Sequence, residues 1–160
     1  GASVVCRREH GERVIAARDF FLDTFTTAIE SFEVLTEIRL PIPGPRSGSA
    51  YRKLERRAGD FSTVGSAVAL RLGMDGRIEE AGVGLTSVAE TPFASGAAEA
   101  ALIGHEPSEE TFRRAATAAA DQSRPVSDVR GPAEYKRAMV AELTTRALRA
   151  ALERARVTGG

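Results

Sequence analysis

Residues 64–88 have the sequence VGSAVALRLGMDGRIEEAGVGLTSV, and this stretch decides the fold class. Apart from the polar Ser66, apolar side chains occupy every second position in its first half: Val64, Val68, Leu70 and Leu72. This period of two predicts a half-buried strand. Asp75-Gly76 is a hairpin signal, so residues 78–88 are the predicted return strand. Gly82 and Gly84 within it predict a bulge or a close packing contact.

The segment upstream of this hairpin predicts a third strand and a linker. Residues 50–57 combine alternating side chains with many positive charges and predict a strand in the middle of the sheet. Three antiparallel strands would then lie side by side. Residues 41–49 contain three prolines and two glycines, which favour a linker between two parts of the chain.

Downstream of the hairpin, the pattern changes from strand to helix. An alanine-rich segment at 94–103 ends at a glycine, a common helix terminator. Ser108 precedes two acidic residues and predicts the start of a second helix that runs to about residue 122. Pro132 suits the first turn of a third helix. Three helices against three antiparallel strands give an α+β class, which buries all the apolar faces economically.

The first forty residues form a separate pattern. Residues 4–7 and 13–15 predict a hairpin, and residues 34–40 predict a further strand that ends at a proline. Asp19, just before two phenylalanines, predicts the cap of a short helical turn. Because the chain begins inside a hairpin without a starting methionine, we expect a fragment of a longer protein.

Composition excludes several classes of protein. The chain has 160 residues, 22 Lys+Arg against 22 Asp+Glu, two histidines and one cysteine. Zero net charge argues against a generic nucleic-acid binder. No apolar run reaches the length of a membrane helix. Cys6 alone cannot support a disulfide, a structural zinc site or an iron–sulfur cluster, and we expect it to be a small apolar residue in a strand. One cysteine and no secretion signal favour a reducing cytoplasm.

The charged run Arg52 to Asp60 is the most unusual feature, and it leaves two interpretations open. It can be a solvated surface, or it can contact an anion, a carboxylate or a partner protein. Phe61 directly follows the turn at 58–60 and also has two interpretations: a plug in the core or a ring beside a cofactor. The composition identifies no catalytic residue and no metal ligand.

Five segments resemble the flavoprotein (medium) subunit of molybdenum hydroxylases, the family of aerobic carbon monoxide dehydrogenase and xanthine dehydrogenase. They are residues 19–21, 25–28, 33–41, 50–61 and 127–137, and they occur in the family's order. The segment 50–61 has the sequence AYRKLERRAGDF, and the segment 127–137 has the sequence SDVRGPAEYKR. The resemblance covers nearly the whole chain.

The resemblance implies a fold and a domain division. Residues 1–41 would be the end of an α/β FAD-binding domain of the vanillyl-alcohol-oxidase type, and residues 42–49 a linker. Residues 50–160 would form the family's C-terminal domain, a three-stranded antiparallel sheet packed on a three-helix bundle. The family's two glycine-rich loops for the FAD pyrophosphate do not occur in this sequence, so we expect the missing part to lie upstream of Gly1.

The resemblance also implies a function. In this family a large molybdopterin subunit hydroxylates the substrate, and [2Fe-2S] clusters in a small subunit carry the electrons. FAD in the medium subunit then passes them to an acceptor. This chain would be part of that FAD-binding subunit, with the molybdenum cofactor and the clusters only in its partners, and inactive in isolation. The alternative is a subunit-docking module that does not bind FAD on its own.

Cofactor-binding residues follow from the matching motif positions. Leu35 matches a position that lies against the flavin, and Lys53 matches a lysine that reaches the cofactor. Phe61 matches the residue beside the isoalloxazine ring. Arg56 and Asp60 lie in the same motif and are expected to tune the flavin's potential or access of the acceptor.

Overall fold

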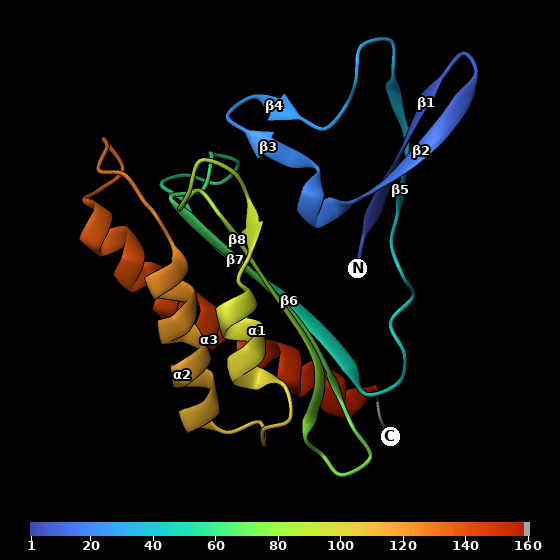
Figure 1. The fold of residues 1–160 in the computed structure, drawn as a ribbon. Coiled ribbons are helices and arrows are strands. Elements are labelled where there is room, and N and C mark those ends of the chain that lie inside the picture. The colour runs from blue at the N-terminus through green and yellow to red at the C-terminus, as the bar shows by residue number, and fades with distance from the viewer. Residues whose placement is uncertain (159–160) are drawn as a thin grey trace. The chain divides into compact units, whose positions relative to one another are not determined.

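A computed structural model describes residues 1–158 of the chain. The chain divides into two compact units, Gly1–Ile42 (unit 1) and Pro43–Gly160 (unit 2). Each unit has its own sheet, as Figure 1 shows, and each is described by itself. Within the described residues, no helix combines the length and the apolar character needed to cross a membrane.

Unit 1 contains a three-stranded antiparallel sheet of order β2-β1-β5 and a small two-stranded sheet. Its elements are β1 (Ser3–Arg8), β2 (Gly11–Ala16), the 3-10 helix η1 (Ala17–Asp19), β3 (Phe21–Asp23), β4 (Thr26–Thr27) and β5 (Val34–Arg39). The predicted hairpin and the predicted strand before Pro41 are therefore confirmed. Its small core consists of Val4, Cys6, Ile15 and Phe20. Cys6 is fully buried in β1, as predicted.

The helical turn predicted at Asp19 is misplaced. Asp19 is the last residue of η1 rather than its cap, and the chain continues from residue 21 as strand β3. The reason is tertiary, because Phe20 turns into the core of unit 1 and its carbonyl oxygen accepts a hydrogen bond from the amide of Ala28, 2.9 Å away. The sequence pattern alone does not reveal that contact.

Unit 2 is built on an antiparallel sheet of order β6-β7-β8-β9. Its strands are β6 (Ser47–Leu54), β7 (Val64–Leu72), β8 (Ile78–Thr86) and the short β9 (Phe93–Ala94). The predicted β7–β8 hairpin is confirmed, with Gly76 in the left-handed region at φ 79°. The three long strands match the predicted sheet, and β9 is a fourth strand that the prediction lacks.

The position and the length of β6 differ from the prediction. Residues 47–49, predicted as linker, already belong to β6, and the strand ends at Leu54 instead of residue 57. It lies at the edge of the sheet, not in the middle. Charged side chains are common on edge strands because they discourage pairing with other chains. The charges of Arg52 and Lys53 therefore do not by themselves require a ligand, and residues 55–57 lie in the loop after the strand.

The predicted packing contact or bulge at Gly82 and Gly84 is also wrong. Both residues pair regularly with alanines of β7, and the register shift lies between Arg71 and Leu72. A side-chain carbon at Gly82 would meet no atom within 4 Å. Val83 and Leu85, which alternate with the two glycines along β8, face the helices, so the glycines lie on the opposite face of the sheet.

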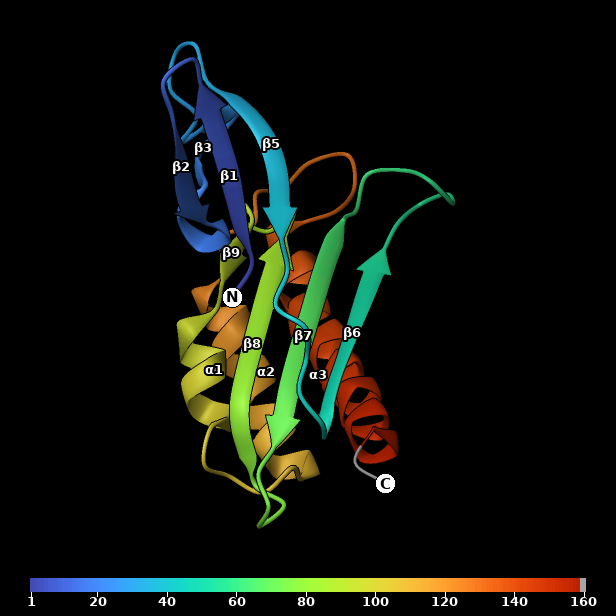
Figure 2. The same ribbon diagram turned by 90° about the vertical axis from the view of Figure 1, so that its right-hand side faces the viewer.

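Three helices cover the other face of the sheet, as Figure 2 shows. They are α1 (Gly96–Leu102), α2 (Glu109–Gln122) and α3 (Ala133–Val157). Ser108 caps α2 by accepting a hydrogen bond from the amide of Thr111, as predicted. The α+β class with a three-helix layer is confirmed. The first helix begins later than predicted because residues 93–94 form β9.

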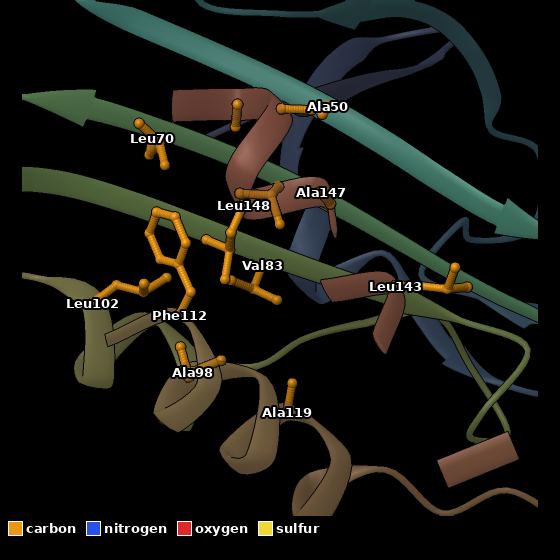
Figure 3. Close-up of a cluster of buried hydrophobic side chains, with 14 of the residues drawn as sticks. Ala50, Leu70, Val83, Ala98, Leu102, Phe112, Ala119, Leu143, Ala147 and Leu148 are labelled. Atoms are coloured by element: carbon orange, nitrogen blue, oxygen red, sulfur yellow. The ribbon is translucent and has the colours of Figure 1, made fainter. Parts of the chain in front are cut away.

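The core of unit 2 lies between the sheet and the helices. Figure 3 shows Phe112 of α2 among Leu102, Val83 and Leu148, which come from α1, β8 and α3. Fully burying such side chains contributes about 1.5–3 kcal/mol each. Ser66, the polar interruption of β7, is fully buried, and its hydroxyl lies 2.9 Å from the Thr144 hydroxyl of α3. Each hydroxyl thus provides a hydrogen-bond partner for the other inside the core.

Candidate functional site

The loop that follows β6, together with the end of that strand, holds four of the five predicted site residues. The amide of Thr63 donates to the carbonyl oxygen of Leu54 at 2.7 Å, which closes the loop where β6 ends and β7 begins. Gly59 provides the turn at φ 85°, a conformation that L side chains rarely adopt. The loop therefore projects from one end of the sheet with a defined shape.

Lys53, on the last part of β6, is tied into this loop. Its Nζ donates to the carbonyl oxygen of Asp60 at 2.6 Å and lies 2.5 Å from Oε2 of Glu55. The lysine side chain is 28% exposed. Its ammonium group thus joins Glu55 to Asp60 across the loop, and part of the side chain stays in contact with solvent.

Asp60 and Phe61 form the outer end of the loop. The Asp60 carboxylate accepts the amide hydrogen of Phe61 at 2.7 Å. Phe61 is 81% exposed, so its interpretation as a core plug is wrong. The same loop surrounds an open hollow of about 470 Å³, lined by Arg56, Arg57, Ala58, Gly59 and Asp60.

A second loop contributes an arginine that the sequence interpretation does not include in the site. Arg130 lies just before α3, and its Nη2 is 3.7 Å from Oδ1 of Asp60. Its guanidinium carbon lies 5.9 Å from the centre of the Phe61 ring, within the range of a cation–π interaction. Lys53, Arg56, Asp60, Phe61 and Arg130 together are called the Phe61 patch below. The family segment at 127–137 is the signal in the sequence that could have found Arg130.

Asp128 and Lys136 support this second loop. Lys136 Nζ lies 2.8 Å from Oδ1 of Asp128. That hydrogen bond, followed by one from the backbone amide of Arg130, holds the pKa of Asp128 below its usual value. Side-chain ion pairs thus join Asp128 to Lys136 and Arg130 to Asp60.

Leu35 lies in unit 1, whereas the other four predicted residues belong to unit 2. It is in β5 opposite Cys6 of β1, and its half-buried side chain packs against the core of unit 1. Its predicted contact with a flavin stays a prediction.

Residues 49–151 match the family of the CO dehydrogenase flavoprotein C-terminal domain. The chain belongs to this family. The matched segment contains all five residues of the Phe61 patch, together with the sheet and most of the helical layer of unit 2. The family resemblance inferred from the motifs is therefore confirmed.

Curated relatives extend the similarity over both units. The carbon monoxide dehydrogenase medium chain of Afipia carboxidovorans is 38% identical over 156 residues, which cover 98% of this chain and 54% of the relative. The protein of the same name from Hydrogenophaga pseudoflava is 37% identical over 153 residues, which cover 96% of this chain and 53% of the relative. This chain thus spans about half the length of these relatives.

Solved structures of the CO dehydrogenase flavoprotein family have the same fold. Reconstituted CO dehydrogenase from Oligotropha carboxidovorans contains a chain with a TM-score of 0.90 and 38% identity, covering 96% of this chain and 54% of that one. A chain of CO dehydrogenase from Hydrogenophaga pseudoflava has a TM-score of 0.91 and 41% identity, and the match covers 96% of this chain and 53% of that one.

Proposed function

We propose that this chain is the C-terminal part of the FAD-binding subunit of a molybdenum hydroxylase. In this proposal, electrons from [2Fe-2S] clusters of a small partner subunit pass through FAD to an acceptor. A large molybdopterin subunit hydroxylates the substrate. The family match over the segment that carries the Phe61 patch is the observation that carries the proposal. We place the protein in the cytoplasm, in keeping with its single, buried cysteine.

The chemistry of the Phe61 patch fits the ring end of a flavin. An exposed aromatic side chain offers a flat apolar surface for stacking, and Lys53 and Arg130 add positive charge beside it. Cations suit a ring system that gains negative charge on reduction. FAD, when bound, supplies the capacity to accept and release electrons one or two at a time. The glycine-rich loops for its pyrophosphate are expected from another part of the subunit.

Each residue of the patch has a distinct task in this proposal. Phe61 presents its ring, and Lys53 keeps the loop closed while its ammonium faces the cofactor. Asp60 orients Phe61 through the backbone and limits the local positive charge through its carboxylate. Arg56 lines the hollow in the same loop, where an anionic group of the cofactor or of the acceptor can approach. Leu35 is expected to add an apolar contact to the flavin.

A titration of FAD with the 160-residue chain tests the proposal through the quenching of flavin fluorescence. We expect saturable quenching and an about tenfold higher Kd for Phe61→Ala, because stacking on an aromatic ring contributes about 1–3 kcal/mol per base. Lys53→Gln should weaken binding to a similar extent, because charged hydrogen bonds contribute about 1.5–3 kcal/mol.

Met74→Ala is the matched control for Phe61→Ala. Met74 is 87% exposed in the β7–β8 turn, at the other end of β7 from the patch. Its replacement should leave the Kd unchanged. Quenching that is absent at high micromolar concentration would contradict FAD binding by this chain alone and leave docking as its function. Quenching that all three substitutions weaken equally would contradict an FAD site at Phe61.

Docking to partner subunits without FAD binding is the second candidate function. Phe25 and Phe32 of unit 1 favour it, because both are fully exposed and both have a positive φ. Exposed aromatic side chains held in an unfavourable backbone conformation are typical of contact surfaces. A chain that shows no FAD quenching but is still recruited by the iron–sulfur subunit in size-exclusion chromatography would support this candidate.

A further inference from the structure

Lys136 is a buried charged residue near the start of α3. Its side chain is only 3% exposed. The ammonium group donates to the carbonyl oxygen of Val126 at 2.8 Å and pairs with the Asp128 carboxylate at 2.8 Å. Burying a lysine is costly unless its charge is paired and its hydrogen bonds are made. Both partners lie in the loop before α3, so the lysine fixes this loop to the helix.

The loop that Lys136 holds is a tight turn with Arg130 at its tip. The Asp128 carboxylate accepts the amide hydrogen of Arg130 at 2.8 Å. The backbones of Asp128 and Gly131 exchange two hydrogen bonds of 3.0 and 3.2 Å. Gly131 has a φ of 144°, which favours glycine. The same carboxylate thus binds Lys136 and determines where the backbone of Arg130 lies.

From this tip, the guanidinium group of Arg130 reaches the loop after β6. It lies near the Asp60 carboxylate and over the Phe61 ring, at the distances given above. Both contacts are weak by themselves, because their partners are partly exposed. The position of the guanidinium group therefore depends on a rigid backbone, which the Lys136–Asp128 pair provides.

We propose that Lys136 is a positioning residue for the Phe61 patch, acting through Asp128 to hold Arg130 over Phe61. Without Lys136, the turn at 126–131 loses its support, Arg130 leaves the ring, and the positive potential at Phe61 falls. That the ring and this potential serve a flavin rests on the proposed function, whereas the coupling between the two loops does not.

A single tryptophan in place of Phe61 reports on this potential. These 160 residues contain no tryptophan, so Phe61→Trp introduces the only indole of this chain. Quenching by iodide, an anion, depends on nearby positive charge, whereas quenching by neutral acrylamide depends only on exposure. The ratio of the two quenching constants at low ionic strength therefore measures the charge near the ring.

Further substitutions in the Phe61→Trp background test the coupling. Arg130→Gln should lower the iodide-to-acrylamide ratio about two- to threefold, as Coulomb's law gives for one charge near 6 Å in water. Lys136→Met should lower it to the same extent, and Lys136→Arg should keep it near the value of Phe61→Trp alone. In the double variant of Lys136 and Arg130, the ratio should fall no further than with Arg130→Gln alone.

An unchanged ratio in Lys136→Met, or equal effects of Lys136→Met with and without Arg130, would overturn the proposal. If Lys136→Met does not fold, the double variant Lys136→Met/Asp128→Asn takes its place, because it leaves no buried charge without a partner. We expect this double variant to lower the ratio as Arg130→Gln does, and an unchanged ratio would again count against the coupling.

FAD added to the same variants separates this inference from the proposed function. If both hold, Lys136→Met weakens FAD binding as much as Arg130→Gln. If the iodide ratios change as expected but FAD does not quench the introduced indole in any variant, the coupling stands and the FAD site fails. If FAD binds the Phe61→Trp chain but the ratios do not change, the FAD site stands and the role of Lys136 fails.

Discussion

At the scale of single residues, the sequence motif suggests the residues of the candidate site that lie in one loop, but not those that support this loop from elsewhere in the chain. Lys53, Asp60 and Phe61 follow from one continuous motif, so a family resemblance identifies them together. Arg130 contacts Phe61 from about seventy positions further along the chain, and local patterns carry no information on such a contact. Lys136 does not stand out in the sequence, because a lysine is normally expected at the surface and only the structure shows its burial.

Glu33 in unit 1 is another charged residue whose environment the sequence does not reveal. Its side chain is 3% exposed and accepts two hydrogen bonds from the Arg13 guanidinium, at 2.7 and 3.1 Å. The bond from Arg13 and one from the Glu30 amide lower the pKa of Glu33 from its ordinary 4.5 to about 2. The folded state therefore favours the ionised carboxylate.

We expect the stability from Glu33 to be present above about pH 4.5 and to disappear as the pH falls toward 2. Because the folded pKa lies below the unfolded one, protons bind preferentially to the unfolded chain in this range. A carbon-13 NMR titration of the Glu33 carboxylate should give an apparent pKa of about 2, and Arg13→Gln should raise it toward 4.5. Glu9→Gln, in the exposed β1–β2 turn, is the control and should not shift it. A Glu33 that titrates near 4.5 in the unmodified protein would contradict this arrangement.

At the scale of elements, the sequence predicts which segments are helices and strands better than it predicts their neighbours. The β7–β8 hairpin and the three helices follow from local periodicity and turn residues. The position of β6 in the sheet does not follow from local periodicity, because alternating charges fit both an edge strand and a central strand beside a ligand. In the part of the chain that the structure describes, β6 pairs with β7 alone, and α3 packs against both strands.

The contact between β6 and α3 depends on Gly48. A side-chain carbon at this position would lie 2.0 Å from the Ala151 carbonyl oxygen and 2.5 Å from the Ala155 amide nitrogen, both in the α3 backbone. Gly48→Ala should therefore separate the strand from the helix and destabilise unit 2 by about 1–3 kcal/mol, the usual cost of overpacking. Urea unfolding followed by circular dichroism measures the change.

Gly82→Ala is the matched control for this prediction. Gly82 also lies in a strand of the same sheet, but an added carbon there meets nothing within 4 Å. Its replacement should leave the urea midpoint unchanged or raise it slightly, because glycine in a strand costs about 0.5–1 kcal/mol relative to alanine. Equal midpoints for the two variants would show that α3 does not approach β6 as closely as described.

At the scale of the whole molecule, the two units differ in how much core each can bury. The buried cluster of unit 2 draws on its sheet and all three helices. Among the described residues of unit 1, four buried side chains form a cluster and Val5 is buried outside it. Unit 1 also exposes many large apolar side chains for its size, among them Phe25, Phe32 and Val34. A segment of about forty residues with so small a core is marginal by itself. The proline- and glycine-rich segment suggests where the chain divides. The difference in core size between the two units depends on which side chains the fold buries, and local sequence patterns do not reveal that.

We therefore expect residues 43–160 to fold without unit 1, and residues 1–42 not to fold alone. The reason is that the apolar contacts and the Ser66–Thr144 pair of unit 2 are all internal to it. Circular dichroism of the shorter chain should show the helical signal of α1–α3 and a cooperative thermal transition close to that of the 160-residue chain. The peptide 1–42 should show no cooperative transition. If residues 43–160 instead lack dispersed amide signals in NMR, the stability of unit 2 depends on unit 1, and the internal core is not sufficient.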